Sequence, residues 1–290
     1  MSSGRQRDRA FSLVELLVVI GIVAILISIF VPYVVNMRET EHRARCAANL
    51  RTLMQGLQSY AKLNRPLFPQ VVYDAAHNPN GYTAFTGAAA PDPFARDSQV
   101  RPNDVTASLW LLVRTGLAQP RLFVCPSTRD LPDPADPAEW KRRSNFSGNQ
   151  FLSYSYASPF SSAASYKLNE YLPSDFALMA DKNPGIVSRT GSNVTKPNYD
   201  SPPLELAQAN SNNHGRAGQN VLYADGHVAF QITPYCGTGS GGMRDNIYTA
   251  LQRLPLAKGP NVPAWTNGVV GPDIAPAWTG DSYLVPTEQD

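Results

Sequence analysis

Residues 11–31 read FSLVELLVVIGIVAILISIFV, and this apolar stretch predicts a membrane-spanning helix. It contains 21 residues and a single charged side chain, Glu15. As an α-helix it extends roughly 31 Å, which is enough to cross the hydrocarbon core of a bilayer. Three arginines precede it, at positions 5, 7 and 9, and positively charged residues stay on the cytoplasmic side of a membrane. The sequence predicts one inner-membrane span, with a cytoplasmic N-terminus and an extracytoplasmic body.

The far end of this apolar run differs from the end of a secretory signal peptide. Residues 28–32 read Ser-Ile-Phe-Val-Pro, whereas a signal peptidase site needs small residues before the cut. We therefore expect the helix to be retained. Glu15 is the unusual residue, because a carboxylate among aliphatic side chains is costly unless it is paired or lies near the membrane surface.

The segment from Arg9 to Leu17, RAFSLVELL, resembles the N-terminal signal of type IV prepilins and type II secretion pseudopilins. The resemblance implies that a prepilin peptidase cuts between Ala10 and Phe11 and that the new Phe11 amine is methylated. Ala10 stands where the family prefers Gly. Glu15 occupies the family's acidic position, where it would neutralise the Phe11 amine of a neighbouring subunit and fix the axial register. The implied partners are the peptidase and other pseudopilin-like subunits.

After Pro32 the hydrophobic pattern becomes amphipathic. Apolar residues recur at spacings of three and four, which is the period of one helix face. We expect a continuous stalk helix over residues 11–64, bent at Pro32 and ending before Pro66. The residues on the predicted inner face are Cys46, Leu50, Leu53, Met54, Leu57, Tyr60 and Ala61.

The charge balance argues against a nucleic-acid-binding surface. The chain has 25 basic and 23 acidic residues, and the surplus of +2 lies within the first ten residues. A nucleic-acid-binding body would need a basic patch of its own. The predicted organisation is a leader at residues 1–10, the stalk at 11–64, a soluble domain at 65–254 and an extension at 255–290. The extension is rich in Pro and contains Trp265 and Trp278, which would pack on the body or contact a partner.

The soluble part predicts an α+β fold, in which the long N-terminal helix packs on a small antiparallel sheet among long loops. Asp225-Gly226 lies between two apolar runs and predicts a hairpin with a two-residue turn, in which both residues take positive φ angles. The other predicted elements are loops at 65–105, a helix at 107–117 that stops at Gly116, and strands at 121–125, 151–156 and 176–181.

Several short motifs extend the resemblance to proteins that have a pseudopilin-like N-terminus and a C-terminal His-x9-Asp-Gly module. His214 precedes Asp225-Gly226, although ten residues lie between His214 and Asp225 in this chain. The other matching motifs are Cys46 with Asn49-Leu50, the triplet Cys125-Pro126-Ser127, and Met-Ala-Asp ending at Asp181. The resemblance covers the chain to about residue 232.

Four polar residues are candidates for a shared site at one end of the sheet: Asp181, His214, Asp225 and His227. Histidine and aspartate bind zinc or another divalent ion, and aspartates in a C-terminal loop bind calcium in major pseudopilins. The alternative is structural, with His214 bonded to Asp225 or to loop backbone and fixing the hairpin. The sequence predicts no cofactor, and a divalent metal remains the alternative.

Three cysteines are too few for a disulfide scaffold. Cys46 lies on the predicted inner face of the stalk, and Cys125 ends the strand predicted at 121–125, which would pack against that face. Outside the cytoplasm a disulfide between them would tie the body to the stalk, and two buried thiols are the alternative. Cys236 is left over.

These features predict a structural, pseudopilin-like subunit of a type II secretion or type IV pilus-like system, and not an enzyme. One alternative is an anchored extracytoplasmic binding module that does not polymerise. Another is a metal-dependent surface enzyme built on His214 and Asp225. No nucleophile motif of the GxSxG type is present in the sequence.

Overall fold

The structure is a computed structural model of the chain. It describes residues 13–74, 102–161, 166–188, 191–192, 197, 200–240, 243–250, 276, 279–285 and 288–289. The chain divides into two compact units, Met1–Glu41 and His42–Asp290. Ala10 and Phe11 at the predicted cleavage site, and Trp265 and Trp278 in the extension, lie outside the described residues.

Helix α1 runs from Leu13 to Leu63 and continues through Pro32. Its first part, Leu13–Val31, is exposed along its whole length and is long and apolar enough to cross a membrane. The helix ends where the chain leaves the helical region at Arg65, which has a φ of 53°. The predicted long N-terminal helix is confirmed, with an end one residue before the expected position. The bend at Pro32 stays a prediction.

The second unit is built around one hydrophobic core to which α1 contributes a continuous face. The buried α1 residues are spaced three and four apart, because that spacing returns side chains to one side of a helix. They pack with side chains of α2 and of the main sheet. The fully or almost fully buried members of the α1 face are Cys46, Leu50, Leu53, Met54, Leu57 and Ala61.

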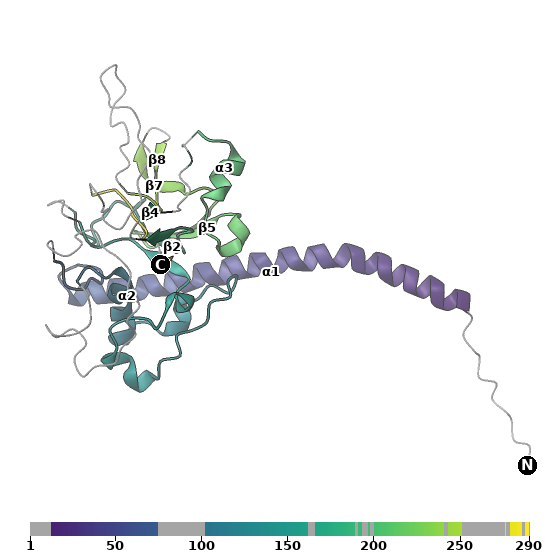
Figure 1. The fold of residues 1–290 in the computed structure, drawn as a ribbon, viewed down its shortest axis with the longest axis horizontal. Helices are drawn as coiled ribbons and strands as arrows, with labels where there is room; N and C mark the ends of the chain where they lie inside the picture. The colour runs from purple at the N-terminus through teal and green to yellow at the C-terminus, as the bar shows by residue number, and fades with distance from the viewer. Residues whose placement is uncertain are drawn as a thin grey trace, which may run out of the picture. The chain divides into compact units, whose positions relative to one another are not determined.

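A four-stranded antiparallel sheet forms the centre of this unit, with strand order β1-β2-β5-β6. Its strands are β1 (Tyr154–Tyr156), β2 (Ala177–Asp181), β5 (Gln219–Tyr223) and β6 (Val228–Gln231). Every residue of β1, β2 and β5 is buried. In Figure 1 β2 and β5 lie together within this unit. The long helix and the small antiparallel sheet confirm the α+β prediction.

Helix α2 spans Val105–Arg114, so the helix predicted at 107–117 is confirmed but begins two residues earlier and ends three residues earlier. The Asp104 side chain caps its first turn by accepting a hydrogen bond from the Ala107 N–H. The helix stops before Gly116, whose φ of 77° favours glycine. Trp110 of α2 is fully buried, and its ring lies 5.0 Å from that of Phe146 in an edge-to-face arrangement.

The strand predicted at 121–125 is wrong, because Pro120–Phe123 forms the 3-10 turn η1. Pro120 begins that turn, and its fixed φ suits a helical start better than a strand interior. The strand predicted at 151–156 is shortened to β1 because Asn149–Phe151 forms the 3-10 turn η3. The remaining elements are η2 (Pro137–Arg142), β3 (Ile186–Ser188), β4 (Gly191–Ser192), α3 (Pro203–Gln208), η4 (Asn213–Arg216), β7 (Tyr235–Ser240), β8 (Met243–Asn246) and β9 (Glu288–Gln289).

Part of the predicted extension belongs to the core. Tyr283, Leu284 and Val285 are buried with the hydrophobic cluster. The Leu284 N–H donates to the Ile247 carbonyl at 2.9 Å. These three residues of the predicted extension therefore contribute to the hydrophobic core of the second unit.

Candidate functional site

The β5–β6 hairpin differs from its prediction at the turn. The Tyr223 N–H donates to the His227 carbonyl, and the Gly226 N–H donates to the Tyr223 carbonyl. These bonds enclose a three-residue loop in which Gly226 takes a φ of 93° and Asp225 does not take a positive φ. A loop of this kind needs glycine only at its last position. The hairpin is confirmed, and the two-residue turn is corrected to a three-residue loop.

Asp225 and His227 form a pair on the surface of this loop. The Nδ1 atom of His227 lies 2.6 Å from Oδ1 of Asp225, and the two side chains are 52% and 43% exposed. The His227 ring stacks on Tyr223 with 4.3 Å between centroids. Burial by itself would raise the pKa of Asp225, but the hydrogen bonds and charge of His227 lower that pKa below its ordinary value.

His214 and Asp181 form a separate, buried pair. Nε2 of His214 lies 3.3 Å from Oδ2 of Asp181, and neither side chain is exposed to solvent. The prediction that Asp181, His214, Asp225 and His227 converge at one site is therefore wrong. Asp225 bonds to the residue two positions ahead in its own loop, whereas Asp181 stands at the end of β2 beside β5.

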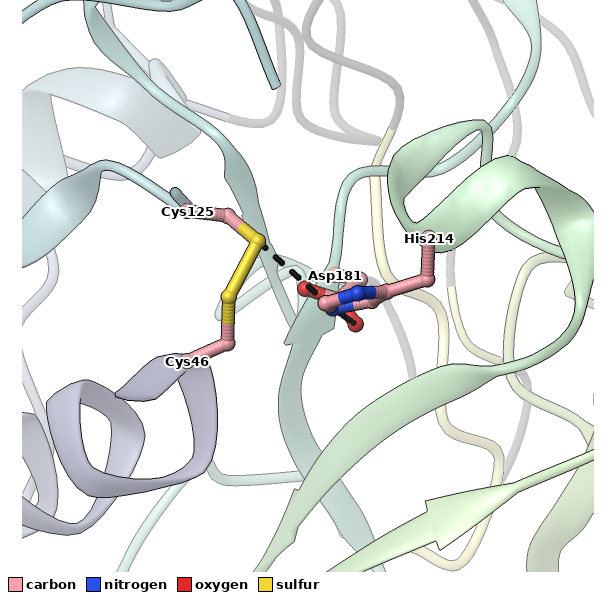
Figure 2. A group of neighbouring side chains, drawn as sticks. All are labelled: Cys46, Cys125, Asp181 and His214. Carbon is pink, nitrogen blue, oxygen red and sulfur yellow. Dashed lines mark hydrogen bonds and ion pairs between the residues drawn. A yellow bond between two sulfur atoms is a disulfide. The ribbon is translucent and has the colours of Figure 1, made fainter. Parts of the chain in front are cut away.

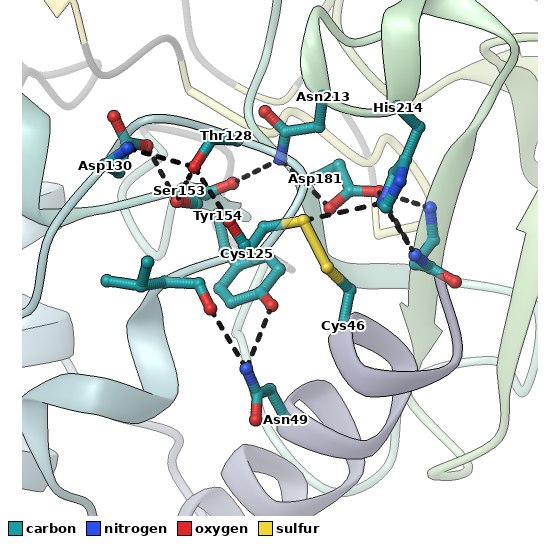
Figure 3. The surroundings of a disulfide bond; sticks show 12 residues. Cys46, Asn49, Cys125, Thr128, Asp130, Ser153, Tyr154, Asp181, Asn213 and His214 are labelled. Carbon is teal, nitrogen blue, oxygen red and sulfur yellow. Dashed lines mark hydrogen bonds and ion pairs between the residues drawn. A yellow bond between two sulfur atoms is a disulfide. The ribbon is translucent and has the colours of Figure 1, made fainter. Parts of the chain in front are cut away.

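Hydrogen bonds fix both oxygens of the Asp181 carboxylate (Figure 3). The Asn213 side-chain amide donates to Oδ1 at 3.0 Å. The Asn220 backbone N–H donates to Oδ2 at 2.6 Å. The backbone carbonyl of Asp181 accepts from the Tyr248 hydroxyl at 2.9 Å. Asp181 thus joins the polar loop before His214 to the start of β5.

His214 is placed by an unusual backbone conformation. It has φ 56° and ψ 24°, and Gly215 follows in the same left-handed region. Histidine is among the few non-glycine residues that are enriched there. The His214 and Phe230 rings lie edge-to-face with 5.8 Å between centroids, and the Arg43 guanidinium lies 4.2 Å from the Phe230 ring centre. Phe230 therefore contacts both the buried imidazole and a cation of α1.

Cys46 and Cys125 form a disulfide between α1 and the segment that follows η1. It closes a loop with a sequence separation of 79, so the structure joins the two cysteines that the sequence paired as one alternative. The Sγ atom of Cys125 lies 3.5 Å from Nε2 of His214 (Figure 2). Asn49, one turn beyond Cys46, donates to the Val124 carbonyl at 3.0 Å. Helix and body are therefore joined covalently and by a hydrogen bond at the same place.

The third cysteine, Cys236, is buried in β7 and is not part of the disulfide. Burial, its largest influence, raises the pKa of the Cys236 thiol to about 12. The sequence correctly leaves it unpaired with another cysteine.

A second set of polar contacts lies next to the Asp181–His214 pair and is linked to it through Asn213. Ser153 donates from its hydroxyl to Asp130 at 2.7 Å, and Lys182 lies 3.3 Å from the same carboxylate oxygen. The Ser153 backbone carbonyl accepts from Asn213. Sequence reasoning missed Asn213, Asn220 and Ser153, although the polar run at 210–213 marked the loop that carries one of them.

Comparison with known proteins identifies the N-terminal part of the chain. Residues 5–31 match the family described as the prokaryotic N-terminal methylation motif. The match includes Ala10, Phe11 and Glu15 and runs into the apolar helix. Searches of curated proteins and of solved structures found no match. The chain therefore carries a prepilin-type N-terminal signal, which includes a helix able to cross a membrane.

Proposed function

We propose that this chain is a pseudopilin-like structural subunit, cut between Ala10 and Phe11 by a prepilin peptidase and assembled through its N-terminal helix. One observation carries the proposal: the methylation motif matched at residues 5–31 contains the exposed apolar helix Leu13–Val31. A leader that is removed at this point gives a helix with a charged amine at its membrane end. The assembly would be a type II secretion or type IV pilus-like filament.

Glu15 is the proposed register residue of that assembly. It lies four residues after Phe11, which is about 6 Å along a helix axis. A carboxylate at this depth is stabilised by a cation, and the Phe11 amine of a neighbouring subunit supplies one. Only one axial offset between neighbouring helices brings the two charges together. The pair would therefore favour subunits that stack with a fixed stagger.

The body supports an extracytoplasmic and structural role. Disulfides persist in oxidising compartments and are rare in the cytoplasm, so the Cys46–Cys125 bond favours the outer side of the inner membrane. The buried Asp181–His214 pair has no exposed side-chain surface on which a substrate would bind. We therefore assign this pair to holding the body together, and not to catalysis.

The test replaces the register residue in cells that assemble the native filament. Glu15→Ala should leave the chain in the membrane but remove it from the sheared filament fraction, because the amine loses its partner. Leu16→Ala is the matched control, since it alters the neighbouring exposed helix position and leaves the charge unchanged. Equal assembly of both variants would contradict the role of Glu15 in filament assembly. That result would favour an anchored binding module that does not polymerise.

A further inference from the structure

Four potential metal-binding side chains meet inside the second unit (Figure 2). They are Cys46 of α1, Cys125 after η1, Asp181 of β2 and His214 of η4. One ligand atom from each lies within 4.8 Å of those from the other three, and all four residues are buried. They come from distant parts of the sequence, so the folded unit itself brings them together.

The disulfide alone does not account for this group. A disulfide is stable in apolar surroundings, whereas a buried carboxylate and imidazole need polar partners. Here Nε2 of His214 faces both the Asp181 carboxylate and the Cys125 sulfur, at 3.3 and 3.5 Å. Two thiolates, one imidazole nitrogen and one carboxylate oxygen are the donor types of four-coordinate zinc. Among divalent ions, the sulfur donors favour zinc over calcium or magnesium.

The carboxylate in this group is already oriented by neighbours. Asn213 donates to one Asp181 oxygen, and the Asn220 backbone donates to the other. Metal ligands in proteins have outer hydrogen-bonding partners of this kind, which hold them in position. The same donors would spread the negative charge that two thiolates and a carboxylate leave around a divalent cation. The hydrogen bonds that would hold Asp181 as a ligand are therefore already present.

We propose that the reduced chain binds one Zn²⁺ through Cys46, Cys125, Asp181 and His214. A dithiol reductant supplies two electrons and two protons to the S–S bond, giving two thiols, and itself becomes a disulfide. Zinc binding then releases both thiol protons. Zinc–sulfur bonds of about 2.3 Å in a tetrahedral site place the two sulfurs roughly 3.8 Å apart, so the S–S bond must break first.

Two exclusive states of one site follow from this assignment. The oxidised chain links α1 to the body through the S–S bond, and the reduced chain links them through the metal. Both states use the same two sulfurs, so they cannot coexist in one molecule. The attachment of the stalk to the body would therefore survive reduction when zinc is available.

The test uses the full-length chain in detergent micelles, stripped of metal. One sample keeps its disulfide, and the other is reduced with a phosphine, which does not compete for zinc. After incubation with zinc and gel filtration, elemental analysis should find about one zinc per reduced chain and none per oxidised chain. Cobalt in place of zinc should give the visible absorption of a tetrahedral thiolate site. A reduced chain that neither retains zinc nor unfolds at a higher temperature with zinc would overturn the proposal.

Variants assign the ligands. His214→Ala and Asp181→Asn should weaken zinc binding by more than the roughly 10–100-fold loss that follows removal of an outer partner, and Asn213→Ala should fall within that range. Each variant retains both cysteines, so its folding is checked first in the oxidised state by circular dichroism. His227→Ala is the matched control, because that imidazole is exposed and lies outside the cluster. If His227→Ala removes the zinc and His214→Ala does not, the site is the surface loop and the assignment is wrong.

Discussion

Asp181 and His214 meet 3.3 Å apart in the interior of the second unit, at the point where β2 ends and the loop before β5 turns inward. The pair lies directly against the only disulfide among the described residues. It joins the end of β2 to η4, two parts of the chain that lie 33 residues apart in the sequence. We therefore expect it to contribute more to stability than any exposed polar pair in the body.

Replacement of Asp181 by Ala should be strongly destabilising. It removes the acceptor for Asn213 and the Asn220 backbone and leaves buried donors without that partner. Losing one member of a buried, hydrogen-bonded pair costs about 3–5 kcal/mol. Chemical denaturation of the oxidised chain measures the change. Asp225→Ala is the control and should cost no more than about 1 kcal/mol, because that pair is exposed. Equal losses for the two variants would contradict the buried network.

Removal of the disulfide should destabilise the second unit in metal-free buffer. The double variant Cys46→Ser and Cys125→Ser opens a long loop and should lower the free energy of unfolding by roughly 2–4 kcal/mol. Cys236→Ser is the control, since it removes a thiol without opening a loop. The change is measured by denaturant titration of all three chains under the same non-reducing conditions. An unchanged midpoint for the double variant would show that the bond does not constrain the chain.

Cys236 should be the one thiol found in the non-reduced chain, and it should react only after unfolding. Burial raises its pKa to about 12, so the folded thiol stays protonated at neutral pH. Because the folded pKa lies above the unfolded value of 9.0, this group stabilises the fold equally at all pH values below 9. The stabilising contribution of Cys236 is lost as the pH rises from 9 toward 12. Thiol titration with and without denaturant tests this, and three reactive thiols would refute the disulfide.

The turn of the β5–β6 hairpin should depend on Gly226. A Cβ there would lie 3.6 Å from the Met54 side chain, which is ordinary contact, so space is not the obstacle. The φ of 93° is the obstacle, and Gly226→Ala should cost about 1–2 kcal/mol. Gly226→Asn should cost less, because asparagine tolerates left-handed backbone. Thermal unfolding of both variants ranks them, and the reverse order would count against this turn geometry.

Local patterns predicted those parts of the fold that depend on neighbouring residues. The face that includes Leu50, Leu53 and Leu57 follows from helical spacing, and the hairpin follows from two apolar runs around Asp225-Gly226. The apolar run at 121–125 is compatible with a strand and with a 3-10 turn. The sequence pattern does not distinguish the two, and in the structure Pro120–Phe123 takes the 3-10 conformation.

The buried cluster could be predicted only in part. One structural alternative was a bond between His214 and Asp225. Asp225 instead accepts from His227 in its own loop, and His214 of η4 pairs with Asp181 of β2. That partner depends on the register between β2 and β5, in which Ala180 faces Val221. Register across a long connection is a property of the whole core. The burial of Cys46 on the inner face of α1 could be predicted, because the helical period fixes which residues share that face.

Processing as a prepilin-type subunit can be checked by mass spectrometry of the N-terminus of the protein isolated from its native membrane. We expect a chain that begins at Phe11 with a methylated amine. A chain that still carries its leader, beginning at Met1 or at Ser2 after ordinary removal of the methionine, would contradict it.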